Sequence, residues 1–201
     1  MSSVSDFDSA DITAAILAGG EGKRVDGRDK GLLALAGKPL VERVATALRG
    51  KANTILICVN RHPHEYAVFG QVVSDTSPGF RGPLAGIASA LASCTTPWLL
   101  TVPVDAPDFP IDLAQRLYAA AVAADSALAV AHDGVRSQPL FALYRAPLAQ
   151  SAQVALDHDL AVWRWQEQLG AATTDFSDRP QAFANLNTLA AMRDWEREHG
   201  Q

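Results

Sequence analysis

The chain has 201 residues, of which 48% are apolar and 19% are charged. This length and composition fit one globular domain with a buried core, and they exclude an intrinsically disordered protein. The 17 Lys and Arg residues are outnumbered by 22 Asp and Glu residues, which gives a net charge of −5. That balance argues against nucleic acid or an anionic membrane as the main partner, and no apolar run reaches the roughly 18 residues that a membrane-spanning helix needs.

Residues 1–11 are rich in Ser and Asp and are expected to form a flexible N-terminal tail, followed by a single domain over residues 12–201. The two cysteines, Cys58 and Cys94, are not spaced as a redox or metal-binding pair. Both are expected to act as small buried hydrophobes. Because the N-terminal segment does not resemble a secretory signal, we expect a cytoplasmic protein.

Buried strands and amphipathic helices alternate along the chain. Residues 12–18 (ITAAILA) form an apolar run that ends in Gly19-Gly20, as expected for a buried strand that enters a tight loop. Pro39 is expected to open a helix with Leu40, Val44 and Leu48 on one face. Further strands are expected at residues 54–59, 71–74, 98–102, 127–131 and 140–144. Further helices are expected at residues 84–91, 110–124, 160–169 and 189–199.

The expected strands are uniformly apolar, which is typical of strands that are buried on both faces. Together with the helices between them, they predict a three-layer α/β fold of Rossmann type with a mostly parallel sheet. Ligands of such sheets bind at the carboxyl ends of the strands. The loops that follow residues 18, 59, 74 and 102 are therefore the candidate binding site.

The loop that follows the first strand, residues 17–32 (LAGGEGKRVDGRDKGL), is the most informative stretch. Its glycines allow backbone N–H groups to approach a phosphate closely, and its Lys and Arg side chains offset the phosphate charge. A P-loop is excluded because Arg24 follows Gly22-Lys23, where that motif requires Ser or Thr. A dinucleotide-binding fingerprint is excluded because Val25 stands where its last glycine is required. The loop predicts a phosphate site of another class.

The loop resembles the L-A-G-G-x-x-x-R-x-x-G-x-D-K signature of nucleotidyltransferases, which here runs from Leu17 to Lys30. Further motifs resemble one family among them, the molybdenum cofactor guanylyltransferases, and this resemblance extends from Thr13 to about Trp195. The motifs are Asn60-Arg61-His62, Asp75 with Gly82-Pro83-Leu84-Ala85-Gly86, Pro103-Val104-Asp105-Ala106-Pro107, His132-Asp133-Gly134, the run from Pro139 to Tyr144, and Phe183-Ala184-Asn185-Leu186-Asn187-Thr188.

This resemblance implies a nucleotidyltransferase fold and an enzyme that transfers GMP from GTP to molybdopterin or its molybdenum-loaded form. Such an enzyme releases pyrophosphate and requires Mg²⁺. The resemblance also implies contacts with proteins that insert the cofactor and with molybdoenzyme chaperones. On the nucleotide side, Leu17, Ala18 and Gly19 would contact GTP, Lys30 would bind phosphate, and Asp75 would hold the nucleotide.

The same resemblance implies further roles for single side chains. Arg24 would join Lys30 as a catalytic residue. Asn185 and Asn187, in the late Asn-x-Asn-Thr element, would contact the second substrate. The alternative for these two asparagines is a helix-entry turn in which Thr188 is the N-cap.

Asp105 would, by the same resemblance, be a catalytic residue that binds both GTP and the metal. Its chemistry suits that role, because Mg²⁺ takes oxygen ligands and attack at an α-phosphorus needs charge neutralisation and alignment. Pro103 and Pro107 restrict the backbone on both sides of this carboxylate. The alternative for Asp105, and also for Asp75, is a carboxylate that stabilises a turn.

One position departs from the family. Two residues before its Asn-Arg pair the family commonly has a polar Asn or Ser, whereas this chain has Cys58. A thiol is a poor hydrogen-bond partner, so Asn60 becomes a candidate for contact with GTP. The departure leaves open a cytidylyltransferase that acts on the same pterin, or a sugar-phosphate nucleotidyltransferase. A non-catalytic nucleotide-binding scaffold is the third alternative, and the presence of Lys30 and Asp105 argues against it.

Overall fold

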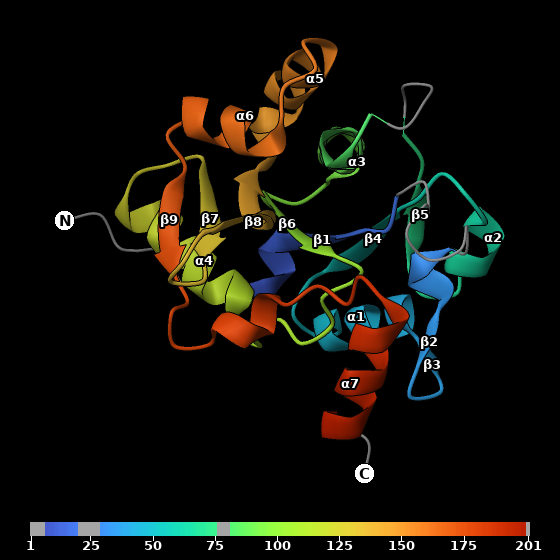
Figure 1. The fold of residues 1–201 in the computed structure, drawn as a ribbon. Helices are drawn as coiled ribbons and strands as arrows, with labels where there is room; N and C mark the ends of the chain where they lie inside the picture. The colour runs from blue at the N-terminus through green and yellow to red at the C-terminus, as the bar shows by residue number, and fades with distance from the viewer. Residues whose placement is uncertain (1–6, 20–28, 76–80, 200–201) are drawn as a thin grey trace.

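The computed structural model describes residues 7–19, 29–75 and 81–199. They form a central sheet of seven strands in the order β5-β4-β1-β6-β8-β7-β9 (Figure 1). The strands are β1 (Ile12–Leu17), β4 (Thr54–Cys58), β5 (Gln71–Val73), β6 (Trp98–Pro103), β7 (Leu128–His132), β8 (Ser137–Arg145) and β9 (Ala172–Asp175). Among these strands β8 alone runs antiparallel to its neighbours, so the expected mostly parallel sheet is confirmed.

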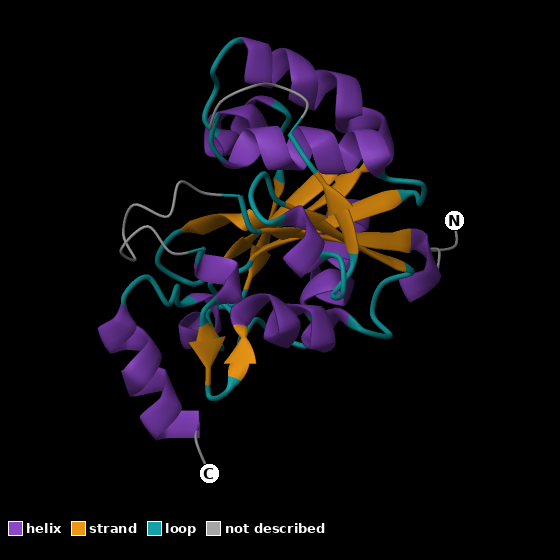
Figure 2. Cartoon of the chain, turned by 90° about the vertical axis from the view of Figure 1, so that its right-hand side faces the viewer, coloured by secondary structure: helices purple, strands orange, loops and turns teal. Residues whose placement is uncertain are grey.

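Helices cover both faces of the sheet, which confirms the expected three-layer α/β fold (Figures 1 and 2). One face is covered by α3 (Pro83–Ser93), α5 (Ala149–Asp157) and α6 (Val162–Gln168). The other face is covered by α1 (Leu40–Leu48), α4 (Leu113–Ala123) and α7 (Leu189–His199). Figure 2 shows α7 extending away from the sheet beside the small hairpin of β2 (Ala34–Leu35) and β3 (Lys38–Pro39).

Strand β1 shows why the apolar runs become strands buried on both sides. Successive side chains of a strand point to opposite faces. Ile12, Ala14 and Ile16 accordingly belong to the core cluster on the α1 side, while Ala15 belongs to the cluster on the α3 side. All four are 0% exposed. A strand with apolar side chains on both faces can bury all of them only in the middle layer of a three-layer fold.

Helix α5 and strand β9 of the three main layers are not predicted by the sequence pattern, and neither are the short helix α2 (Pro63–Tyr66) and the β2–β3 hairpin. Helix α5 is built mainly from small and polar residues and buries Ala152, Ala155 and Leu156 against the α3 side of the sheet. Strand β9 lies at the edge of the sheet and alternates buried and exposed residues, so it lacks the continuous apolar run of the central strands. Strand β8 also begins earlier than expected, at Ser137.

The segment expected to be a flexible tail contains a short 3₁₀ helix, η1 (Ser9–Asp11). Asp8 caps this helix by accepting a hydrogen bond from the backbone N–H of Ala10 at 2.8 Å. Phe7 packs edge-to-face against Tyr118 of α4. Residues 1–6 lie outside the described part of the chain. No helix among the described residues is long and apolar enough to cross a membrane.

The carboxyl ends of the central strands meet at one edge of the sheet. Leu17 at the end of β1 is aligned with Cys58 at the end of β4 and with Pro103 at the end of β6. Strand β5 is parallel to β4 and aligns Val73 with Cys58. The loops that leave β1, β4, β5 and β6 therefore start side by side, as expected for a ligand site in a parallel sheet.

Candidate nucleotide-transfer site

Lys30, Asp105 and Asn187 meet at this edge although they are far apart in the sequence. The ammonium Nζ of Lys30 lies 2.6 Å from Oδ2 of Asp105 and 2.7 Å from Oδ1 of Asn187. The side chains of Lys30 and Asp105 are only 20% and 18% exposed. A cation is thus held between a carboxylate and an amide oxygen in a partly desolvated site, where charge interactions are stronger than in bulk water.

The backbone positions Asp105 by hydrogen bonds on two sides. The N–H of Val104 donates to the carbonyl of Leu17 at 3.1 Å, so the exit of β6 is tied to the exit of β1. The N–H of Leu186 donates to the carbonyl of Asp105 at 2.7 Å. The segment that carries Asn187 is therefore fastened to the metal-ligand candidate itself, which explains how this late segment reaches Lys30.

The Asn-x-Asn-Thr element forms the helix-entry turn that is one of the two roles its sequence suggests. Thr188 is the N-cap of α7, because its Oγ1 accepts a hydrogen bond from the N–H of Ala191 at 3.1 Å. Asn187 nevertheless turns its side chain towards Lys30. The side chain of Asn185 is exposed, and its backbone carbonyl accepts a hydrogen bond from the N–H of Asn187 at 3.0 Å.

Asn60 and Asp75 form a reciprocal pair between the exits of β4 and β5. The amide nitrogen of Asn60 donates to Oδ2 of Asp75 at 2.6 Å. In return, Oδ1 of Asn60 accepts from the backbone N–H of Asp75 at 2.8 Å. Both polar atoms of the Asn60 side chain are thus engaged with Asp75, which fixes the orientation of this carboxylate.

Cys58 lies below the candidate site and does not face it. Its side chain is 2% exposed, and its thiol contacts the carbonyl of Gly86 in α3 at 3.3 Å. Burial, and to a smaller extent the negative charge of Asp75, raises the pKa of the Cys58 thiol to about 12. The side chain at the position that departs from the family is therefore a neutral part of the sheet–helix interface.

Backbone groups at the end of β1 are hydrogen-bonded to the exits of the neighbouring strands. The carbonyl of Leu17 accepts from Val104, and the N–H of Ala18 donates to the carbonyl of Cys58 at 3.0 Å. Gly19 is exposed at the end of the described segment. Arg24, which the sequence assigns to catalysis, lies outside the described residues, as does the loop from residue 20 to residue 28.

Tyr66 belongs to the same region and was not among the sequence-derived candidates, whereas its partner Asp29 is part of the nucleotidyltransferase signature. Tyr66 is the last residue of the short helix α2 (Pro63–Tyr66). Its side chain is 0% exposed, and its hydroxyl donates a hydrogen bond to Oδ1 of Asp29. Asp29 directly precedes Lys30. The only available sequence signal was the occurrence of this tyrosine shortly after the Asn-Arg-His motif.

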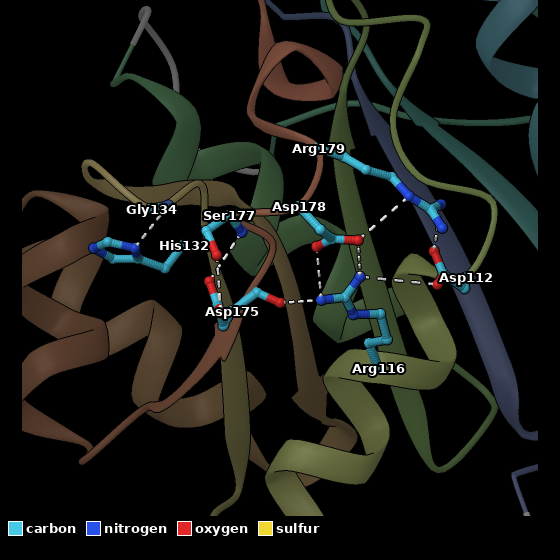
Figure 3. A network of polar contacts seen from close by, with 8 residues as sticks. All are labelled: Asp112, Arg116, His132, Gly134, Asp175, Ser177, Asp178 and Arg179. Carbon is cyan, nitrogen blue, oxygen red and sulfur yellow. Dashed lines mark hydrogen bonds and ion pairs between the residues drawn. The ribbon is translucent and has the colours of Figure 1, made fainter.

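A second polar network holds the approach to the Asn-x-Asn segment (Figure 3). Arg116 of α4 donates to both carboxylate oxygens of Asp178, each at 3.1 Å, and to the carbonyl of Asp175 at the end of β9. Arg179 adds an ion pair with Asp112 at 3.3 Å. The hydrogen bonds from Arg116 hold the pKa of the Asp178 carboxyl below its usual value. This network fixes the chain between β9 and α7.

His132, the residue of the His-Asp-Gly turn, has a local structural contact. Its Nδ1 accepts a hydrogen bond from the N–H of Gly134 at 3.1 Å, within the turn that joins β7 to β8. Figure 3 shows this ring on the side of Asp175 and Ser177 that lies away from Arg116. The contact stabilises the turn between the two strands.

Known proteins resemble this chain in sequence over most of its length. Residues 14–173 match the family model of the MobA-like NTP transferase domain. A molybdenum cofactor guanylyltransferase of Shewanella loihica is 41% identical over 182 residues, which cover 90% of this chain and 93% of that protein. One of Mannheimia succiniciproducens is 42% identical over 183 residues, which cover 90% of this chain and 96% of that protein.

Solved structures share the fold at lower sequence identity. Molybdopterin-guanine dinucleotide biosynthesis protein A from Archaeoglobus fulgidus superposes with a TM-score of 0.76 at 20% identity, covering 92% of this chain and 97% of that chain. The 2-C-methyl-D-erythritol 4-phosphate cytidylyltransferase from Thermus thermophilus superposes with a TM-score of 0.67 at 17% identity, covering 92% and 96%. The fold is thus shared by transferases of different nucleotides, so it does not by itself decide the base.

Proposed function

Since the chain belongs to the MobA-like NTP transferase family, we propose that it transfers GMP from GTP to molybdopterin, releases pyrophosphate and forms a molybdopterin guanine dinucleotide. The observation that carries this proposal is the meeting of Lys30, Asp105 and Asn187 at the carboxyl edge of the sheet. These residues come from the phosphate loop, from the exit of β6 and from the segment before α7. One cluster therefore adjoins the nucleotide elements and the element assigned to the second substrate.

Lys30 and Asp105 suit an in-line displacement at the α-phosphorus of GTP. An oxygen of the acceptor attacks this phosphorus, the bond to the bridging oxygen breaks, and pyrophosphate leaves. Such a transfer needs alignment and charge neutralisation more than covalent participation by the protein. Lys30 supplies a positive charge at the site, and Arg24 of the same loop is proposed as a second catalytic cation.

The donor atoms of the site fit Mg²⁺. Asp105 and Asn187 offer a carboxylate and an amide oxygen, and the ammonium of Lys30 already occupies the space between them. Within residues 7–19, 29–75 and 81–199 there is no group of three or more His, Cys, Asp and Glu side chains that could form a metal cage. This suits Mg²⁺, which is usually held by one or two carboxylates together with substrate phosphates and water. We propose Asp105 as the protein ligand; the ion would neutralise phosphate charge.

We propose that the nucleotide lies over the exits of β1, β4 and β5. Leu17, Ala18 and Gly19 would line one side, and Asp75 would line the other. Asn60 then acts by holding the Asp75 carboxylate, because both of its amide atoms are engaged there. The thiol of Cys58 is directed towards Gly86, so recognition of guanine would fall to backbone groups and to Asp75.

For the second substrate we propose Asn185 and Asn187. The fixed position of this segment on Asp105 would bring the acceptor close to the α-phosphorus. Proteins that insert the finished cofactor, including molybdoenzyme chaperones, are proposed as partners because a labile dinucleotide cofactor has to be passed to an apoenzyme.

The deciding experiment incubates the purified protein with Mg²⁺, molybdopterin and one of GTP, CTP or ATP, and measures pyrophosphate release. Release that requires both GTP and molybdopterin is expected. Equal release with CTP would instead support a cytidylyltransferase that acts on the same pterin. Binding of GTP without release under any of these conditions would support the nucleotide-binding scaffold.

A further inference from the structure

Tyr66 has a buried hydroxyl that is directed at the phosphate loop. The tyrosine ring belongs to the core cluster on the α1 side of the sheet and is 0% exposed. Its hydroxyl donates to Oδ1 of Asp29. Burial, followed by the hydrogen bond to Asp29, raises the pKa of Tyr66, so the hydroxyl stays protonated and remains a donor. The rigid core thus reaches the loop through one hydrogen bond to a carboxylate.

Asp29 links Tyr66 to the backbone next to Lys30. The same Oδ1 atom accepts a second hydrogen bond, from the N–H of Gly31 at 3.2 Å, and so caps the 3₁₀ helix η2 (Lys30–Leu32). A Cβ atom on Gly31 would fall well inside contact distance of the Tyr66 hydroxyl. The hydroxyl is therefore packed directly against the backbone of η2 as well as bonded to its cap.

Lys30 lies between these two anchored residues and extends away from them to Asp105 and Asn187. A lysine side chain has a long flexible stem, and ordering it costs conformational entropy. A backbone that is fixed at the residues before and after Lys30 limits the region that its ammonium can reach. The precise placement of the Lys30 charge should therefore depend on the anchored turn.

We propose that Tyr66 is a positioning residue for Lys30 and acts through Asp29. In this scheme the tyrosine does not touch substrate, and its hydroxyl holds the capped turn from which Lys30 reaches the triphosphate. The proposal rests on the proposed function for one point, namely that Lys30 binds the triphosphate of GTP. It adds a residue of α2, outside the loop and outside the carboxyl ends of the strands, to the machinery of the site.

The test is a double-mutant cycle on GTP affinity, measured by titration calorimetry in the presence of Mg²⁺. Tyr66→Phe retains the ring and removes the hydroxyl. In the wild-type background it should weaken GTP binding about tenfold, as expected for a hydrogen bond to a charged group. In the Lys30→Ala background the same substitution should change the affinity by less than about twofold, because the residue that it positions is gone. An equal loss in both backgrounds, or no loss in either, would overturn the proposal.

Tyr144→Phe is the matched control. Tyr144 is also 0% exposed, and its hydroxyl accepts a hydrogen bond from Gln166 at 2.6 Å on the opposite face of the sheet. Tyr144→Phe removes a buried tyrosine hydroxyl that does not contact the η2 turn, so GTP affinity should remain within about twofold of wild type. A tenfold loss in Tyr144→Phe would show that any buried hydroxyl has this effect, which would remove the support for a specific role of Tyr66.

A crystal structure of Tyr66→Phe provides a readout that needs no substrate. The contacts of Lys30 Nζ with Asp105 and Asn187 are expected to be lost or lengthened, while Tyr144→Phe retains them. Both contacts retained in Tyr66→Phe would overturn the proposal. If the wild-type protein binds GTP but transfers no GMP, the proposed function fails while the positioning of Lys30 is still decided by this comparison.

Asp29 offers a second route if Tyr66→Phe does not fold. Asp29→Ala removes the acceptor and should weaken GTP binding in the wild-type background as Tyr66→Phe does. In the Lys30→Ala background, Asp29→Ala should leave GTP affinity nearly unchanged. Asp29→Asn keeps an acceptor oxygen, so its affinity should lie closer to wild type. Equal affinities of the Ala and Asn variants would contradict the role of this acceptor.

Discussion

Lys30 is proposed to lend its positive charge to the triphosphate of GTP. Replacement by Ala leaves the core untouched, because Lys30 is held by polar contacts at the sheet edge. We expect Lys30→Ala to lower turnover about ten- to a hundredfold, the effect of losing a charge-assisted contact, with the far-UV spectrum unchanged. Lys38→Ala is the matched control, since the Lys38 side chain is 62% exposed. Near-normal pyrophosphate release by Lys30→Ala would contradict the role of this residue.

Asp105 should matter for activity much more than for folding. Asp105→Ala removes the proposed Mg²⁺ ligand, so pyrophosphate release is expected to be lost at every Mg²⁺ concentration tested. Asp105→Asn keeps one oxygen ligand without the charge and should show weak metal binding and little turnover. The melting temperature of both variants should stay close to that of the wild type, because the side chain lies outside the hydrophobic core. Full recovery of Asp105→Ala at high Mg²⁺, or its failure to fold, would instead assign Asp105 to stabilising the turn.

Cys58 should be chemically inert in the native protein. Its thiol is 2% exposed and its pKa is raised to about 12, so at pH 8 only about one molecule in ten thousand carries the reactive thiolate. We expect iodoacetamide to leave Cys58 unmodified in the folded protein and to modify it readily in guanidinium chloride. Mass spectrometry of the peptide that contains Cys58 measures this. Rapid labelling of the native protein would contradict the burial of this side chain beneath the site.

At the scale of elements, the segment from β9 to α7 depends on Arg116. This side chain is 29% exposed and that of Asp178 is 51% exposed, so their pairing contributes little to stability. Its larger effect should be on position, because it holds the chain that leads to Asn185 and Asn187. Arg116→Ala is expected to raise the KM for molybdopterin severalfold and to leave GTP affinity nearly unchanged. The control is Arg164→Ala, which removes an exposed arginine of α6 that lies over Trp163. Equal effects of both variants would argue against this role.

The central strands and their order in the chain were predictable because a strand that is buried on both faces requires a continuous apolar run, as in β1. Edge strand β9 was not, because its four residues, Ala-Thr-Thr-Asp, are short of apolar side chains and resemble a loop as much as a strand. Helix α5 lacks the apolar stripe that marks an amphipathic helix, since its buried positions are mainly Ala. The predictable part of the fold is thus the part whose packing demands large apolar side chains.

The same distinction applies to the site. The phosphate loop and Asp105 were recognisable because each is a local motif. The contact of Lys30 with Asn187 joins residues that are 157 positions apart, and no local spacing encodes it. The pairing of Tyr66 with Asp29 escaped prediction for the same reason, because the two residues are 37 positions apart and only Asp29 belongs to a recognised motif.

On the scale of the whole molecule, two core clusters share the strands of one sheet. Trp98 is buried in the cluster on the α1 side, and Trp165 is buried in the cluster on the α3 side. Because neither layer of helices can leave without exposing the sheet, the protein should unfold as one cooperative unit. Urea unfolding of Trp98→Phe and of Trp165→Phe can be followed by tryptophan fluorescence and by far-UV circular dichroism. In each variant the two probes should give the same unfolding transition. A separate early transition in either variant would indicate two independently stable parts.

Gly31 and Tyr66 occupy adjoining space, and this restricts how the two positions can change during evolution. An alanine at position 31 would put its methyl group into the volume of the tyrosine hydroxyl, whereas the ring atoms Cε1 and Cζ are 3.1 Å from the Cβ position and could give way slightly. Substitution of the glycine is therefore tolerable only after the hydroxyl has been lost. In the intermediate sequence the hydroxyl is already lost and the glycine is still present, so Asp29 has no tyrosine donor. Relatives that keep the tyrosine at position 66 should accordingly keep glycine at position 31, whereas loss of the tyrosine frees position 31 to change.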